Sequence, residues 1–167
     1  MSNPLNADDL GKEFIRYARK KFLEEYYPRI ERCVNELSDE DIWWRAHESD
    51  NSIGNLMLHL SGNVRQWIVT GVGGATDVRN RPQEFAERMH LPKGELLEKL
   101  HATLVEADRV LERLDRSVLL EVRHIQQYDV TVLEAIFHVV EHFSGHTSQI
   151  IYITKLRKGV DLKFYNL

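Results

Sequence analysis

One stretch decides the fold: Phe137-His138-Val139-Val140-Glu141-His142-Phe143-Ser144-Gly145-His146-Thr147-Ser148-Gln149. Three of the eight histidines of the chain recur there at intervals of four residues. A helix turns about 100° per residue, so His138, His142 and His146 lie on one face of a helix. Burying three imidazoles without partners would cost roughly 1–3 kcal/mol each. This face therefore predicts a metal ion, or a network of carboxylate and water, around the rings.

Composition is that of an ordinary globular protein. The chain has 167 residues, of which 43% are hydrophobic and 29% charged, so we expect one domain covering residues 1–167. The net charge of −4 argues against a general nucleic-acid binder. No apolar run approaches the roughly 20 residues needed to cross a bilayer, and no secretory signal is visible. We expect no nucleic-acid or membrane partner, and the single cysteine, Cys33, fits a cytoplasmic location.

Four segments show the apolar spacing of amphipathic helices. They are residues 7–37, 52–70, 92–114 and 131–158. Pro28 predicts a kink near Tyr27 in the first segment, because proline lacks a backbone donor. Ser52 is suited to cap the second helix, while Thr131 and Glu134 form a capping box for the fourth. Within residues 117–130 the character of the side chains alternates from one residue to the next, which allows a short extended segment. The pattern predicts an all-α four-helix bundle.

A long connection, residues 71–92, joins helices 2 and 3. Its density of glycine and charge argues against a packed element, although some helix is possible within residues 83–89. Its length makes it a candidate lid or crossover. Arg79 and Arg81 are within reach of an anionic substrate, but we expect them to be solvated charges on the surface of the connection.

Helix 2 offers a histidine to the face on helix 4. His59 lies on the shoulder of an apolar stripe, so we expect a half-exposed ring, and Asn63 lies one turn further along the same side. Metal sites in helix bundles are built in the core from facing helices. Two histidines from helix 4 with His59 would leave one coordination position open, which is typical of reactive sites.

The sequence resembles the DinB-like superfamily of metal-binding four-helix proteins, and is most similar to an uncharacterised branch of it. The resemblance is carried by Asn51-Ser52-Ile53-Gly54-Asn55-Leu56-Met57-Leu58-His59-Leu60-Ser61-Gly62-Asn63 and by residues 138–149. It implies a divalent ion, nickel or zinc, held by His59, His142 and His146, often in a homodimer. Superfamily members include transferases and isomerases that use bacillithiol, mycothiol or glutathione, and proteins described as metal-dependent hydrolases.

Five further residues are candidates for supporting the site or for contacting a small-molecule substrate. They are His138, Gln149, Asn63, Arg45 and Trp43. His138 lies one turn before the matched pair and is open to a supporting role, a proton-relay role or an alternative role as ligand. Gln149 occupies a position that is often glutamine in the superfamily, which is consistent with a hydrogen bond that supports the site. Two adjacent tryptophans, Trp43 and Trp44, cannot face the same way, so we expect one in the core and the other at a surface or pocket.

Three interpretations follow from these residues. The first is a metal-dependent enzyme that activates a water or a low-molecular-weight thiol, of the thiol-transferase or hydrolase class. The second is a non-catalytic, stress-related bundle that binds a metal or ligand. The third is the inverzincin protease pattern His-x-x-Glu-His at His138, Glu141 and His142. That pattern needs a further acidic ligand well downstream, and only 25 residues follow His142.

Overall fold

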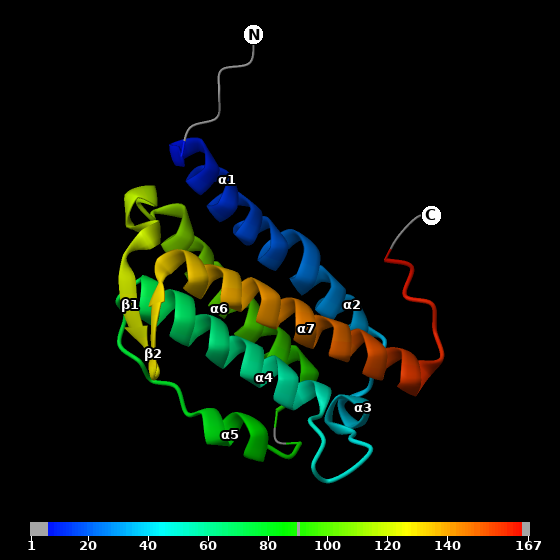
Figure 1. The fold of residues 1–167 in the computed structure, drawn as a ribbon. Helices are drawn as coiled ribbons and strands as arrows, with labels where there is room; N and C mark the ends of the chain where they lie inside the picture. Colours follow the sequence, from blue (N-terminus) through cyan, green and yellow to red (C-terminus); the bar gives the residue numbers. More distant parts are fainter. Residues whose placement is uncertain (1–6, 90, 165–167) are drawn as a thin grey trace.

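The computed structural model describes residues 7–89 and 91–164, and it confirms an all-α four-helix bundle (Figure 1). The described part contains four long helical rods. The first rod is α1 (Ala7–Lys20), continued by η1 (Lys21–Tyr26) and α2 (Tyr27–Asn35), and the second is α4 (Ile53–Val64), continued by η2 (Arg65–Val72). The third rod is α6 (Lys93–Glu112) and the fourth is α7 (Val132–Lys158). The shorter elements are α3 (Asp39–Trp43), α5 (Arg81–Ala86), η3 (Arg116–Leu120), β1 (Val122–Ile125) and β2 (Tyr128–Thr131). No described helix combines the length and the apolarity needed to span a membrane.

The first rod widens where the sequence predicts a kink. Residues Lys21–Tyr26 form a π-helix, and α2 begins immediately afterwards with Pro28 in its first turn. Proline lacks a backbone donor and crowds the carbonyl four residues earlier, so an ordinary helical turn cannot continue through it. The wider π-turn passes through this position without ending the rod.

Side-chain caps fix the starts of the two rods that carry the histidines. The Ser52 side chain accepts from the backbone N–H of Asn55, and the Thr131 side chain accepts from that of Glu134; each forms a capping box. At the other end of α7, Gly159 adopts a left-handed conformation with φ 63°. The predicted starts of helices 2 and 4 are therefore confirmed.

The long connection is a crossover. The backbone N–H of Lys93, at the start of α6, donates at 2.7 Å to Asp39 of α3, and Trp43 of α3 packs on Gly54 at the start of α4. At the other end, a Cβ on Gly73, just past η2, would lie 2.9 Å from Val110 of α6. Therefore α4 and α6 run in the same direction, and the connection returns along the bundle (Figure 1). The expectation of no packed element is wrong, because α5 lies against α4 and buries Glu84.

Helix α4 is buried almost all round. Its predicted stripe is confirmed, since Ile53, Met57, Leu60 and Val64 are fully buried. The expectation that His59 is half-exposed is wrong, because only 5% of this residue is exposed. Helices α6 and α7 cover two sides of α4 and α5 covers a third, which periodicity within α4 does not reveal.

The two tryptophans separate as predicted. Trp43 packs in the core against Gly54 and donates its indole N–H to the carbonyl of Leu91 at 3.0 Å. Trp44 is half-buried, with the Arg157 guanidinium 4.9 Å from its ring centre.

The extended segment is a two-stranded antiparallel hairpin in which Val122 pairs with Thr131 and Ile125 with Tyr128.

Two glycine substitutions test the packing of these helices, with opposite expected signs. A Cβ at Gly54 would lie 2.8 Å from the Trp43 ring, which is held by core packing and its hydrogen bond. We expect Gly54→Ala to lower the free energy of unfolding by about 1–3 kcal/mol. Nothing lies within 4 Å of a Cβ at Gly145, so Gly145→Ala should raise it by about 0.5–1 kcal/mol. Urea denaturation measures both, and equal effects would contradict this packing.

Candidate metal centre

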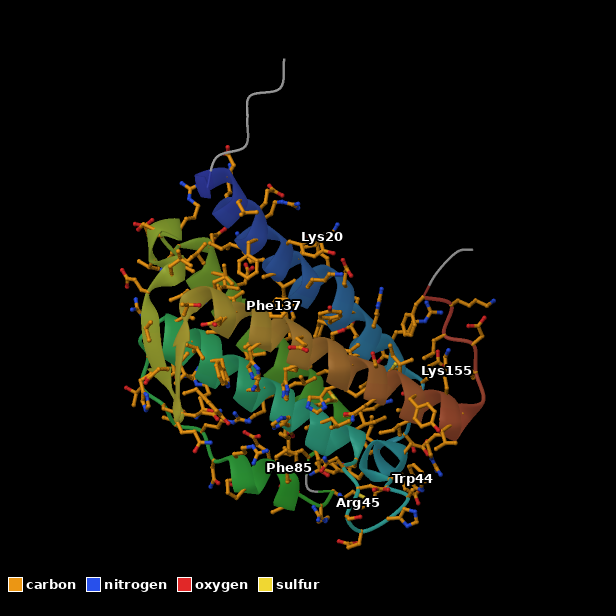
Figure 2. The ribbon with its side chains drawn as sticks, in the orientation of Figure 1. Lys20, Trp44, Arg45, Phe85, Phe137 and Lys155 are labelled. Atoms are coloured by element: carbon orange, nitrogen blue, oxygen red, sulfur yellow. The ribbon has the colours of Figure 1, made fainter. Side chains whose placement is uncertain are left out.

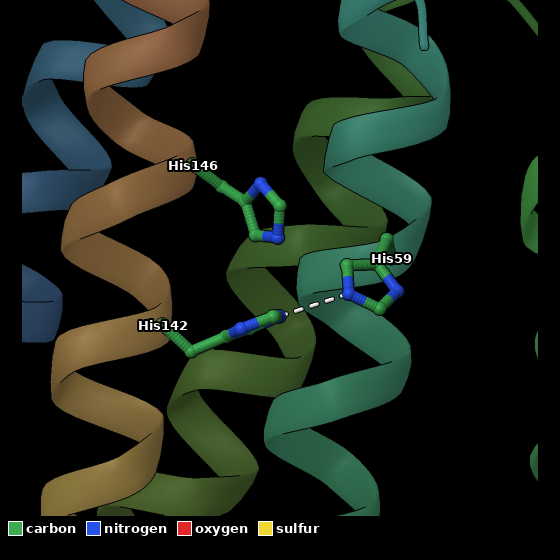
Figure 3. A group of neighbouring side chains, drawn as sticks. All are labelled: His59, His142 and His146. Carbon is green, nitrogen blue, oxygen red and sulfur yellow. Dashed lines mark hydrogen bonds between the residues drawn. The ribbon is translucent and has the colours of Figure 1, made fainter. Parts of the chain in front are cut away.

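Three histidines from two rods meet between α4 and α7, with His59 buried and His142 and His146 half-buried. His59 extends from α4 towards His142 and His146, which lie one turn apart on α7 (Figure 3). One nitrogen from each ring can be chosen so that all three lie within 4.8 Å of one another. The Nε2 atoms of His59 and His142 are 2.8 Å apart. These are the three histidines that the resemblance implies as ligands.

The short separation of two ring nitrogens has a chemical consequence. A neutral imidazole carries a proton on one nitrogen and a lone pair on the other. At 2.8 Å, Nε2–H of one ring can donate to the lone pair of the other. A divalent ion between the rings would take the place of this proton and bind both lone pairs.

Outer hydrogen bonds orient two of the rings. Nδ1 of His59 lies 3.0 Å from a Glu84 oxygen, and Nδ1 of His146 lies 2.7 Å from Oε1 of Gln149. A carboxylate and an amide oxygen only accept, so Nδ1–H of each ring donates and each Nε2 keeps its lone pair. Nη2 of Arg79 also lies 3.1 Å from Nδ1 of His59, but it donates to Glu84 at the shorter distance of 2.8 Å. This pattern is typical of histidines that bind metals.

A buried ion pair holds Glu84 in place. The Arg79 guanidinium donates to both Glu84 oxygens, through Nε at 2.7 Å and Nη2 at 2.8 Å, and through Nη1 to Gln66. Burial alone would raise the pKa of Glu84, but the hydrogen bonds from Arg79 and His59 outweigh it and lower that pKa. Glu84 is therefore a carboxylate, ready to accept from His59.

Glycine makes room for this pair. A Cβ at Gly62 of α4 would lie 1.9 Å from Oε1 of Glu84 and 2.9 Å from Nε of Arg79. The expectation that Arg79 is solvated is therefore wrong, since its side chain is only 4% exposed. Sequence analysis missed Glu84 altogether. The general preference of metal-binding histidines for a carboxylate partner was a signal, but it did not select among the acidic residues.

The surroundings keep the rings on α7 neutral. The pKa of His142 is lowered to about 3, and burial is the largest cause. Repulsion from the neighbouring His146, His59 and His138 and from Arg79 lowers it further. Burial also lowers the pKa values of His138 and His146, the latter against the opposing effect of Gln149. Neutral imidazole is the form that binds metals.

The donor set fits a divalent ion. Three neutral imidazoles suit zinc, copper, iron or nickel, and three protein ligands leave a position for an exchangeable group. A hollow of about 370 Å³ gives access from outside and is lined by His138, Glu141, His142, Gly145, His146 and Gln149. Within residues 7–89 and 91–164, these three histidines are the one group of three potential ligands brought together. No acidic residue there joins His138 and His142, as the inverzincin pattern would require.

The other candidate residues lie in different settings. His138 lines the hollow and packs on Trp67, with ring centres 4.2 Å apart, while its ring centre is 5.5 Å from that of His142. Asn63 is buried, and its Oδ1 has no hydrogen-bond partner in the described residues. Trp43 has a core-packing role instead of a place in the hollow. Arg45 lines a separate pocket between the segment that follows α3 and the C-terminal half of α7.

Removing the Glu84 charge should destabilise the protein and loosen the site. Glu84→Gln would leave the Arg79 guanidinium buried without a counter-charge, at a cost of about 3 kcal/mol of unfolding free energy. It should also weaken metal affinity by roughly tenfold or more. Urea denaturation and competitive zinc titration measure the two effects.

A partly exposed pair, Arg65 with Glu106, provides the matched control. Glu106→Gln should cost less than about 1 kcal/mol and leave zinc affinity unchanged. In the double variant Arg79→Met/Glu84→Gln the loss of stability should be smaller than the sum of the single losses. Additive losses, or an effect of Glu106→Gln equal to that of Glu84→Gln, would contradict the buried pair.

Comparisons with known proteins agree with the fold. The chain resembles a conserved protein from Enterococcus faecalis, with 15% identity and a TM-score of 0.69 over 93% of this chain and 99% of that one. It also resembles a DinB-like protein from Bacillus cereus, with 10% identity and a TM-score of 0.65 over 82% and 88% of the two chains. No curated protein matches. Residues 9–166 match the family described as "Protein of unknown function (DUF1572)", so the chain belongs to this DinB-like family.

Proposed function

We propose that this protein is an enzyme that depends on a divalent metal ion bound by His59, His142 and His146. The observation that carries the proposal is the convergence of three imidazoles, two of them oriented by outer hydrogen bonds. The buried carboxylate of Glu84, which α5 places beside His59, is the kind of outer partner that metal-binding histidines use. Nickel and zinc are the ions we favour, because imidazole suits both.

The residues of the chain have separable tasks in this proposal. Glu84 accepts a hydrogen bond from Nδ1–H of His59 and so keeps Nε2 directed to the centre, while Arg79 keeps Glu84 ionised. Gln149 does the same for His146 from the exposed side. A divalent ion held in this way would lower the pKa of a water or thiol in its open position.

That chemistry serves two reaction classes, hydrolysis and transfer of a low-molecular-weight thiol. The hollow beside the histidines opens to the outside, so a small molecule can reach the centre. His138 lines this hollow with a neutral ring, and we propose that it contacts the substrate or relays a proton there. Both reaction classes share the same ligands and differ in what occupies the pocket around them.

Metal content tests the ligand set. We expect His142→Ala to abolish stoichiometric metal in the purified protein, because two remaining imidazoles hold a divalent ion weakly. His138→Ala is the matched control and should keep at least half of the metal. Elemental analysis by mass spectrometry measures both. Full retention of metal in His142→Ala would reject the site, and complete loss in His138→Ala would make His138 a ligand.

Turnover tests the enzymatic proposal. The metal-loaded protein is incubated with bacillithiol, mycothiol or glutathione and an electrophile, and separately with ester and amide substrates in the absence of thiol. We expect turnover in one of the two series that His142→Ala lowers by at least a hundredfold. Stoichiometric metal without turnover in either series would favour the alternative, a metal- or ligand-binding protein without catalysis.

A further inference from the structure

A second, larger pocket lies beside the metal centre. It has a volume of about 590 Å³, within the range of small-molecule sites. One wall is the segment that follows α3, including Trp44 and Arg45, and the other is the C-terminal half of α7. Figure 2 shows Trp44 and Arg45 at the same end of the bundle as the last turns of α7.

Arg45 gives this pocket a fixed positive charge. Its Nη2 donates to Oδ1 of Asn55 at 2.9 Å, and Asn55 is itself fully buried and bonded to Ser52. Within residues 7–89 and 91–164, Arg45 forms no ion pair with a carboxylate. The acid on the pocket wall, Asp50, accepts instead from the backbone N–H of His47 at 3.0 Å. A guanidinium has five N–H donors in a planar fork, so most of this one remains available to an anion.

The opposite wall is apolar. Tyr152 is 68% exposed and Leu156 is 58% exposed, and both line the pocket together with Leu56 and Ile153. From Gln149 to Leu156 the wall follows α7 for roughly 10 Å, given a rise of about 1.5 Å per residue. A ligand that matches both walls is amphipathic, with an acid at one end and an apolar body.

Gln149 connects this pocket to the metal centre. Its side-chain oxygen accepts a hydrogen bond from Nδ1 of His146. The same residue lines both the hollow at the histidines and the larger pocket. A molecule anchored at Arg45 and lying along α7 would therefore extend towards the open side of the three histidines.

We propose that this pocket binds a small amphipathic carboxylate, the substrate or co-substrate of the metal centre, through Arg45 and the apolar face of Tyr152 and Leu156. Its link to catalysis rests on the proposed function above, whereas binding itself does not. A carboxylate fits better than a phosphate, because one guanidinium compensates a single negative charge and Asp50 on the wall would repel a dianion.

A titration with matched probes tests this site. The probes are 4-phenylbutyrate and its neutral amide, and binding is followed by NMR shifts in the purified protein. The same titration in the metal-depleted variant His142→Ala separates binding at Arg45 from direct ligation of a metal. We expect the carboxylate to bind at least tenfold more tightly than the amide in both proteins.

Three variants locate the interaction. Arg45→Gln should remove the tenfold preference for the carboxylate. Tyr152→Glu alters an exposed side chain, so the protein should fold normally, and it should weaken carboxylate binding at least tenfold through charge repulsion. Arg109→Gln removes an exposed arginine of α6 that does not line the pocket, and it should leave both affinities unchanged.

Equal binding of acid and amide, or no binding of either at millimolar concentration, would overturn the proposal. A preference that disappears in His142→Ala would also overturn it, by assigning the carboxylate to the metal. The preference for the carboxylate could be kept in His142→Ala while the unaltered, metal-loaded protein shows no turnover. That pair of results would support the binding site and reject the enzymatic proposal.

Discussion

The structure depends on the approach of two helices that carry opposed imidazoles. The Nε2 atoms of His59 and His142 lie 2.8 Å apart, close enough for the two rings to share a proton or bind one ion. Glu84 accepts a hydrogen bond from Nδ1–H of His59 and so leaves the Nε2 lone pair of this ring directed to the centre. The crossover places Glu84 behind α4, and Gly62 lets its carboxylate come close. The connection that carries α5, the space at Gly62 and the Arg79–Glu84 ion pair thus all help to hold the ring of His59 in one orientation.

Much of the fold could be predicted because it is encoded locally. The capping residues Ser52 and Thr131 mark helix starts through their own hydrogen bonds, and both caps form as expected. The spacing of four residues between His142 and His146 places the rings on one face whatever surrounds them. The facing of helices in a bundle already offered His59 as their neighbour, the resemblance to DinB-like proteins selected the set of His59, His142 and His146, and the structure brings the three together.

What could not be predicted depends on contacts between distant segments. Burial of His59 and Arg79 is imposed by α5, which packs on α4 although its own sequence is rich in charge. Charged residues indicate a solvated loop until a partner such as Glu84 is known, and a single sequence does not supply that partner. Trp43 was considered as a contact to substrate for its chemistry alone, and its burial against Gly54 follows from tertiary packing.

The central claim is that three imidazoles from two helices share one ion. X-ray absorption spectroscopy of the zinc-loaded protein measures this most directly, since imidazole gives a distinctive multiple-scattering pattern. The account predicts three imidazole nitrogens at about 2.0–2.1 Å, and two in His59→Ala. A zinc shell with fewer than three imidazoles in the unaltered protein, or one unchanged by His59→Ala, would contradict it.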